Sequence, residues 1–275
     1  MTENTCTITI DGKTVELPVV EGTTGDRAID ISRLRELTGV TTLDPSLANT
    51  ASCRSAISWI DGENGRLLYR GIPIETLAEN KVSFVETAML LITGRLPTPA
   101  ERNDFSELLA RNSALHRNMD LHFNAFPPNS HPMAIMSAMI NAMSTHDRPK
   151  ITDEDSAIRN SAKLMSRVRT IAAASYKASV GEPAIYPRMD LKYVENFMHM
   201  MFGKKEDKET VDALAMLFVL HADHEQNCSA STVRMVGSSE ADLFQSITAG
   251  IGALSGPLHG GANSAVLEML ETIQS

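Results

Sequence analysis

The chain has 275 residues, of which 43% are hydrophobic and 21% are charged. This composition is that of a folded globular protein, and it excludes disordered and collagen-like chains. The 25 Lys and Arg residues against 34 Asp and Glu residues give a formal net charge of -9, which has the wrong sign for a protein that binds nucleic acid by neutralising phosphates. Net charge describes the electrostatic field far from the protein, so a chain with a net negative charge can still have a local basic pocket for a small anionic metabolite.

The three cysteines, Cys6, Cys53 and Cys228, have neither the number nor the spacing of a disulfide framework or a zinc motif. The first residues lack the basic and apolar regions of a secretion signal. No apolar run reaches the roughly 18 residues that a membrane span requires. We therefore expect a cytoplasmic protein in a reducing compartment, without a membrane partner.

Two hairpins are expected near the start of the chain. Residues 7–10 and 13–17 alternate with period two about Asp11-Gly12, a pair that favours the positive φ angles of a tight turn. A second hairpin is expected over residues 56–70, with glycines in its turn. Residues 1–70 are thus predicted to form an N-terminal β-rich unit.

From about residue 74 the apolar residues follow the helical period, so residues 71–275 are predicted to form a helical large domain. Thr98-Pro99 with Glu101 has the pattern of a helix start, because the Thr hydroxyl and the acid can accept hydrogen bonds from amides of the first turn. Further starts are expected at His131-Pro132, Thr152, Asp207 and Ser239, and helix ends at Gly181, Gly203 and Gly237. The predicted fold class is mainly α, preceded by a small N-terminal β unit.

A stripe of apolar residues predicts one strongly packed helix. The spacing of its members keeps them on one helical face; they are Met133, Met136, Met139, Ile140 and Met143. Methionine fills irregular gaps between helices, so the stripe is interpreted as core, and a cofactor-binding motif is the alternative.

The first segment that could carry chemistry is His221-Ala222-Asp223-His224-Glu225-Gln226-Asn227, which follows an apolar helix expected over residues 213–220. His221 and His224 are three apart and would share one helical face, so a metal site has to be considered. The segment lacks an H-E-x-x-H arrangement, and no third His or Cys stands at a suitable spacing. It is either the wall of a binding pocket or a polar cluster whose members satisfy one another in a helical core.

The second segment is Gly256-Pro257-Leu258-His259-Gly260-Gly261-Ala262-Asn263, followed by an apolar helix pattern. Glycines on both sides allow a close approach of the backbone and would leave His259 exposed near a helix N-terminus. The positive end of a helix disfavours imidazolium, so a neutral His259 would donate a hydrogen bond to a developing oxyanion. The alternative is a glycine-rich helix crossing with an incidental histidine. The glycine pattern is not a phosphate loop, because it lacks the G-K-[ST] ending.

Taken together, these two segments resemble citrate synthases nearly letter for letter, in particular the longer form of Gram-negative bacteria. The similarity extends over almost the whole chain, with further matching strings at residues 60–74, 130–133, 186–188 and 196–198. The resemblance implies a mostly helical large domain, a smaller domain that closes over the substrate, and condensation of acetyl-CoA with oxaloacetate to give citrate and CoA. It implies no metal and no cofactor, since acetyl-CoA is a substrate, and a homodimer or a dimer-based hexamer.

Site residues follow from the same resemblance. His259 matches the neutral histidine that donates to the thioester carbonyl while the acetyl methyl group loses its proton. His224 matches a ligand of oxaloacetate, and His221 and Asn227 are expected to support the pocket from the same helix. The catalytic aspartate base, a second carbonyl-polarising histidine and the arginines that hold oxaloacetate and CoA lie in a part of the family's chain beyond Ser275. The sequence is therefore interpreted as an N-terminal fragment that is inactive alone and lacks the small domain.

Allosteric members of this bacterial group bind the inhibitor NADH through a basic cluster. Near the positions of that cluster, this chain has Arg111, Lys163 and Arg167, but Asn112 stands where a histidine is expected. Two interpretations therefore stay open: an inhibitory NADH site, or basic side chains that are simply solvated on the surface. For the whole protein, 2-methylcitrate synthase is the nearest alternative enzyme, because it condenses another acyl-CoA with oxaloacetate. A non-catalytic helical assembly protein is the alternative from a different class.

Overall fold

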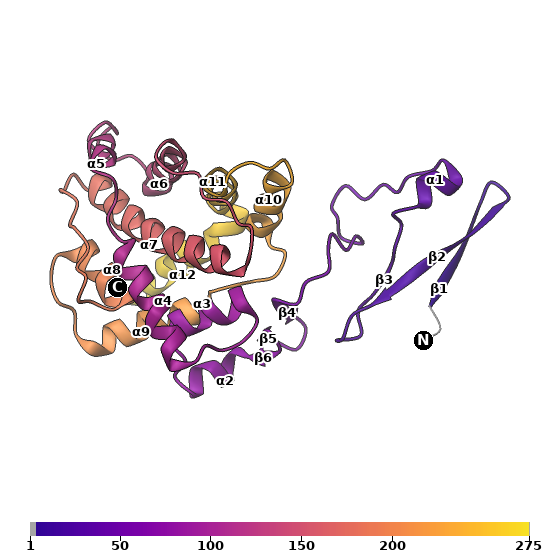
Figure 1. The fold of residues 1–275 in the computed structure, drawn as a ribbon, viewed down its shortest axis with the longest axis horizontal. Helices are drawn as coiled ribbons and strands as arrows, with labels where there is room; N and C mark the ends of the chain where they lie inside the picture. The colour runs from indigo at the N-terminus through magenta and orange to yellow at the C-terminus, as the bar shows by residue number, and fades with distance from the viewer. Residues whose placement is uncertain (1–3, 275) are drawn as a thin grey trace. The chain divides into compact units, whose positions relative to one another are not determined.

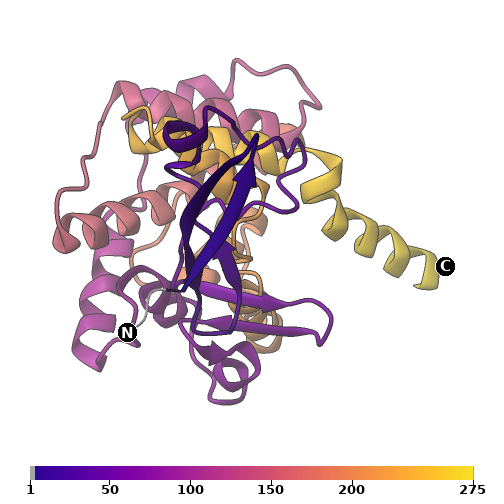
Figure 2. The ribbon, with the colours of Figure 1, turned by 90° about the vertical axis from the view of Figure 1, so that its right-hand side faces the viewer.

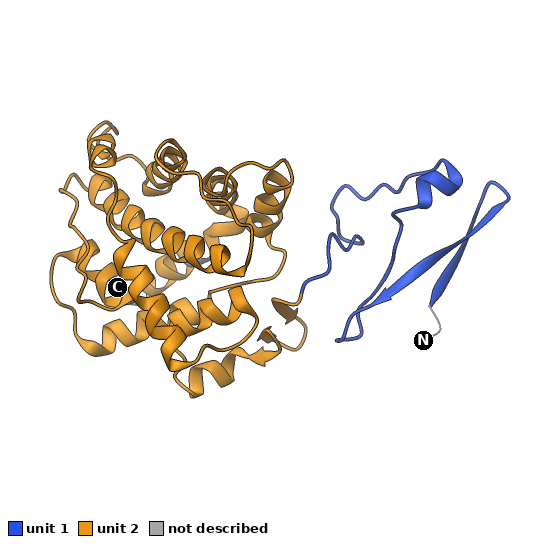
Figure 3. Cartoon of the chain, in the orientation of Figure 1, with its two compact units in different colours: residues 1–55 blue, residues 56–275 orange. Residues whose placement is uncertain are grey.

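The computed structural model describes residues 4–274, apart from the side chains of residues 263 and 274. The chain divides into two compact units, residues 1–55 and 56–275 (Figure 3). The boundary predicted at residue 70 therefore differs from the one in the structure. Tyr69 explains the difference, because its fully buried ring packs with Leu77, Leu90 and Val219 of the helical unit.

The first unit is built on the predicted Asp-Gly hairpin. Strands β1 (Thr5–Ile10) and β2 (Lys13–Glu21) pair antiparallel, and β3 (Arg27–Ile29) pairs with β2. At the turn, Asp11 and Gly12 have φ angles of 51° and 78°, which are the left-handed conformations that the pair predicts. A short helix, α1 (Leu34–Thr38), follows.

The second unit begins with the second predicted hairpin. Strands β4 (Ser58–Asp61), β5 (Arg66–Tyr69) and β6 (Ile72–Pro73) form an antiparallel sheet in the order β4-β5-β6, so β4 lies at an edge. The remaining elements are helical, as predicted (Figure 1). They are α2 (Ile74–Glu79), α3 (Phe84–Thr93), α4 (Pro99–Arg111), α5 (Arg117–Phe123), α6 (Pro132–Ala142), the 3₁₀ helix η1 (Met143–Thr145), α7 (Glu154–Ser179), α8 (Tyr193–Phe202), α9 (Lys208–Leu220), α10 (Cys228–Gly237), α11 (Leu243–Leu254) and α12 (Pro257–Gln274).

Three helix starts show how well capping patterns locate boundaries. The predicted capping box of Thr98 and Glu101 is confirmed at α4. The start predicted at Thr152 is wrong by one residue, because Asp153 caps α7. The start predicted at Ser239 is also wrong. Asp242 caps α11 by accepting the Phe244 and Gln245 amides, whereas the Ser239 hydroxyl donates back to Val236.

The methionine stripe is confirmed as core. Ile135, Met139, Ile140 and Met143 are buried together with residues of α7 and α11, and Met133 and Met136 pack against them partly buried. Helix α6 lies beside both α7 and α11 (Figure 1). No helix among residues 4–274 combines the length and hydropathy that crossing a bilayer requires.

Candidate functional site

The segment from His221 to Asn227 is a loop, so the prediction that His221 and His224 share a helical face is wrong. Helix α9 ends at Leu220, and His221 caps its C-terminus with Nδ1 2.8 Å from the Leu217 carbonyl oxygen. Asn227 starts α10 instead, because its side-chain oxygen accepts from the Ala230 amide at 2.9 Å. The two residues thus belong to different helices, and His224 lies exposed between them.

Hydrogen bonds from β4 explain why the segment leaves the helical conformation. The Asp223 carboxylate accepts from the Ser58 hydroxyl, and Glu225 Oε1 accepts from the Ile60 amide at 2.7 Å. Glu225 also has a φ of 54°, in the left-handed region that is costly for a residue with a Cβ. The loop is therefore held by partners that lie far away in the sequence.

Tyr69 of β5 adds a contact at the beginning of the same loop. Its hydroxyl lies 3.2 Å from the carbonyl oxygens of both Leu220 and Asp223, and it accepts from the Asp223 amide at 3.3 Å. Burial raises the pKa of this hydroxyl, which keeps it protonated and able to donate.

His259 lies in the first turn of α12, so its predicted place near a helix N-terminus is confirmed. It is half-buried and not exposed as expected, because its Nε2 lies 2.8 Å from the Oγ of Ser229 on α10. Ser229 Oγ also lies 2.9 Å from the carbonyl oxygen of Gly250 on α11. Because a hydroxyl has one proton, the Ser229 proton goes either to Gly250 or to His259, and this choice sets the tautomer of a neutral His259.

The glycines of this region serve helix packing. A Cβ at Gly260 would lie 2.0 Å from the Leu254 carbonyl oxygen, so no side chain fits where α12 begins against α11. A Cβ at Gly250 would meet Val233 Cγ2 of α10 at 2.6 Å. These close approaches bring Ser229 to His259. The two segments of the candidate site therefore meet at the first turn of α10, which contains Ser229 and is capped by Asn227.

The three basic residues of the second candidate site are only partly brought together. Lys163 and Arg167 lie one turn apart on α7 and both pair with Asp147, at 2.6 Å and 3.4 Å to its Oδ2. Burial raises the pKa of Asp147, but the hydrogen bond and charge of Lys163 and the charge of Arg167 outweigh it and hold this pKa below its usual value. Arg111, by contrast, is exposed and pairs with Glu107 of its own helix.

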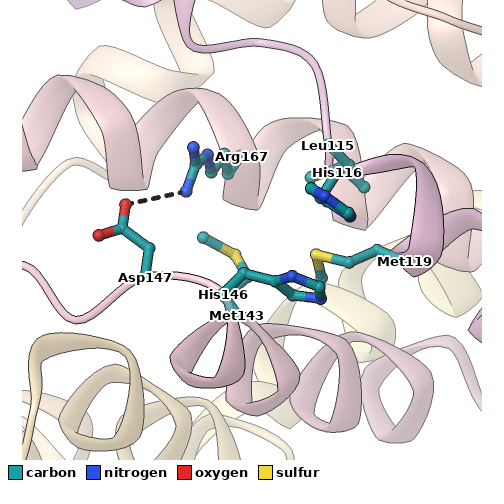
Figure 4. A pocket seen from close by; sticks show the side chains of 7 residues that line it. All are labelled: Leu115, His116, Met119, Met143, His146, Asp147 and Arg167. Carbon is teal, nitrogen blue, oxygen red and sulfur yellow. Dashed lines mark hydrogen bonds and ion pairs between the residues drawn. The ribbon is translucent and has the colours of Figure 1, made fainter.

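Arg167 and Asp147 line a small cavity of about 150 Å³ (Figure 4). The rings of His116 and His146 lie in it with their centroids 4.5 Å apart. The other lining residues are Leu115, Met119 and Met143. Sequence reasoning missed the two histidines, since they are 30 residues apart and neither belongs to a recognisable motif. Within the described part of the chain, no group of three or more His, Cys, Asp or Glu residues could hold a metal ion.

Known proteins resemble this chain along nearly all of its length. A family model described as "Citrate synthase, C-terminal domain" matches residues 46–275. Citrate synthase 1 of Mycobacterium tuberculosis is 46% identical over 280 residues, which cover 99% of this chain and 65% of the relative. Citrate synthase of Corynebacterium glutamicum is 44% identical over 271 residues, which cover 96% of this chain and 62% of the relative.

Solved structures agree with the fold. The citrate synthase of Thermotoga maritima has a TM-score of 0.73 and 36% identity, and the match covers 85% of this chain and 62% of that one. The citrate synthase of Thermoplasma acidophilum, solved as a ternary complex with carboxymethyl coenzyme A and oxaloacetate, has a TM-score of 0.80 and 26% identity over 86% of this chain and 62% of that one. This chain thus spans less than two thirds of the length of these relatives. The family model and the identity to curated relatives show that the chain belongs to the citrate synthase family.

Proposed function

We propose that the protein condenses acetyl-CoA with oxaloacetate and water to give citrate and CoA, the entry step of the tricarboxylic acid cycle. The observation that carries the proposal is the placement of His259 in the first turn of α12, fixed by Ser229. Such a donor is already oriented before charge develops on the thioester oxygen, which is the condition under which electrostatic stabilisation is most effective. In this proposal acetyl-CoA is a substrate, and the family resemblance implies neither a cofactor nor a metal.

His259 would act as a neutral donor. For its Nδ1–H to donate to the thioester carbonyl, its Nε2 has to stay unprotonated and accept a hydrogen bond, and the Ser229 hydroxyl, 2.8 Å away, can donate that bond. The methyl group of acetyl-CoA would then lose its proton while His259 stabilises the enol oxygen.

Oxaloacetate would be bound by His224, whose side chain is exposed in the loop between α9 and α10. His221 and Asn227 would support this site from the two helix ends that border the loop. The resemblance assigns the proton acceptor and the arginines that bind both substrates to residues outside this chain. The 275 residues alone are therefore expected to release no CoA at an enzyme-like rate.

Assembly and regulation complete the proposal. We infer that the protein assembles as a homodimer or a dimer-based hexamer in the cytoplasm. It would belong to the longer bacterial form of the family, which has an N-terminal β unit, and the Gram-negative subtype stays a prediction. In Figure 2 the second half of α12 extends away from the other helices of its unit, and Val266, Leu267, Met269 and Ile273 are exposed on it. NADH inhibition would involve Lys163 and Arg167, which both pair with Asp147, whereas Arg111 pairs with Glu107. Of these residues, Arg167 and Asp147 line the cavity of Figure 4.

The test is CoA release from acetyl-CoA or propionyl-CoA, each with oxaloacetate. We expect no turnover by the 275-residue chain, and turnover with acetyl-CoA by a polypeptide that continues it to the length of its relatives. A preference for propionyl-CoA would instead indicate 2-methylcitrate synthase. No turnover by the continued polypeptide with either acyl-CoA would indicate a non-catalytic protein.

A further inference from the structure

We infer that Asp223 and Glu225 are positioning residues that hold His224 by fastening both of its neighbours to strand β4. The inference rests on the proposed function, in which His224 binds oxaloacetate. It makes the hairpin from Ser58 to Tyr69 a part of the substrate-binding machinery.

Glu225 provides the first anchor. Strand β4 is an edge strand of its sheet, and its Ile60 amide donates to Glu225 Oε1 at 2.7 Å. The carboxylate thus takes the place that a carbonyl of a further strand would have. A φ of 54° at Glu225 places the side chain so that it can reach β4. This conformation persists because the surrounding contacts determine it, as is typical of functional sites.

Asp223 anchors the other side of His224. Its Oδ2 accepts from the Ser58 hydroxyl and, at 3.2 Å, from the Glu225 amide. One carboxylate therefore binds β4 and also closes the turn around His224. The Tyr69 hydroxyl, from the neighbouring strand, holds the Asp223 backbone as well.

These contacts leave the imidazole of His224 exposed while the backbone on both sides of it is fixed. A ligand whose backbone is fixed before binding loses less conformational entropy when substrate arrives. Loosening the loop should therefore weaken oxaloacetate binding, even though neither acidic side chain has to touch the substrate.

Three substitutions of Glu225 separate its hydrogen bond from its backbone strain. Glu225→Gln keeps an acceptor for the Ile60 amide. Glu225→Ala removes the acceptor and keeps the strained φ. Glu225→Gly removes the acceptor and relieves the strain. Glu86 offers a matched control, because its carboxylate also accepts a backbone amide, that of Ser83 at 2.9 Å, but in a helix cap on α3.

In the polypeptide continued to the length of its relatives, Glu225→Ala should raise the KM for oxaloacetate about tenfold, as expected for one lost hydrogen bond. The KM for acetyl-CoA should change little. Glu225→Gln should restore the wild-type KM, Glu225→Gly should resemble Glu225→Ala, and Glu86→Ala should leave both KM values unchanged. Equal changes for both substrates, or a Gln variant as impaired as the Ala variant, would overturn the inference.

A second measurement does not depend on catalysis. In the 275-residue chain, Glu225→Ala should accelerate hydrogen exchange of the Ile60 amide and shift the imidazole NMR signals of His224, and Glu225→Gln should do neither. If the continued wild-type polypeptide shows no turnover, the proposed function fails, and these signals alone decide the positioning role. An unchanged Ile60 amide in Glu225→Ala refutes it.

Discussion

The methionine-rich core around α6 and the loop from His221 to Asn227 are built in different ways. The core consists of side chains that recur with the helical period and are buried against α7 and α11. The loop has no periodicity, and its conformation depends on hydrogen bonds between residues 165 positions apart. A core of this kind distributes its stability over many contacts, whereas the loop depends on single atoms. The following predictions test that difference, from the largest expected effect to the smallest.

Truncating the core should give the largest change. Ile140 is fully buried in the cluster of α6, α7 and α11, so Ile140→Ala should lower the free energy of unfolding by about 2–5 kcal/mol. Urea titration followed by circular dichroism measures this. The control is Ile151→Ala, because Ile151 is 54% exposed and its truncation should cost far less. Similar losses in both variants would mean that α6 is not part of the stabilising core.

Substitutions of the two candidate histidines should affect different kinetic quantities. In the continued polypeptide, His259→Ala should slow the chemical step by a factor on the order of a hundred or more, because its partner charge develops only in the transition state. His224→Ala should chiefly weaken oxaloacetate binding, since that contact exists in the ground state as well. Oxaloacetate affinity and single-turnover rates measure both effects. If each variant changes both quantities equally, the assigned roles are wrong.

Removing the hydroxyl next to His259 should have a smaller effect. Ser229→Ala deletes the hydrogen bond that selects the tautomer of His259, and the rate should fall on the order of tenfold, the value of one neutral hydrogen bond. Ser238 caps the other end of the same helix, with its hydroxyl bonded to the Met235 carbonyl oxygen, and Ser238→Ala serves as the control. A rate equal to that of the control would remove Ser229 from the site.

The smallest effect concerns an exposed helix cap and depends on pH. The hydrogen bond from Arg95, together with those from Thr98, lowers the pKa of Glu101 from 4.5 to about 2 in the folded protein. A carboxyl whose pKa is lowered on folding stabilises the protein above its unfolded pKa, and this stabilisation is lost as the pH falls toward the folded pKa. Glu101→Gln should thus lower the Tm at pH 6 and lose its effect near pH 2.

Thermal unfolding across this pH range provides the measurement. Glu107→Gln, on the same helix, removes a surface ion pair with Arg111 and should change the Tm less, since exposed pairs contribute little. A destabilisation by Glu101→Gln that is constant from pH 6 to pH 2 would contradict the assignment of the low pKa to the cap.

Sequence reasoning succeeded where the structure is local. The Asp11-Gly12 turn, the Thr98 cap and the methionine stripe each depend on residues within about ten positions, and all three are confirmed. It failed for the loop at His224, which was expected to continue as a helix, because no local pattern shows that Ser58 and Ile60 bind its carboxylates. The unit boundary was misplaced for the same reason, since the burial of Tyr69 depends on Val219. The chemical roles of His224 and His259 stay predictions.

The glycine at position 260 implies an uneven tolerance to mutation along one helical turn. His259 is half-buried, so other side chains fit its position and the fold survives its loss. At Gly260 any side chain would collide with the Leu254 carbonyl oxygen at 2.0 Å, and α12 would have to move away from α11. A library of random variants selected only for folding should therefore retain Gly260 and lose His259. In a protein that had lost its activity, selection for folding would thus conserve Gly260 more strongly than its neighbour His259, the catalytic candidate.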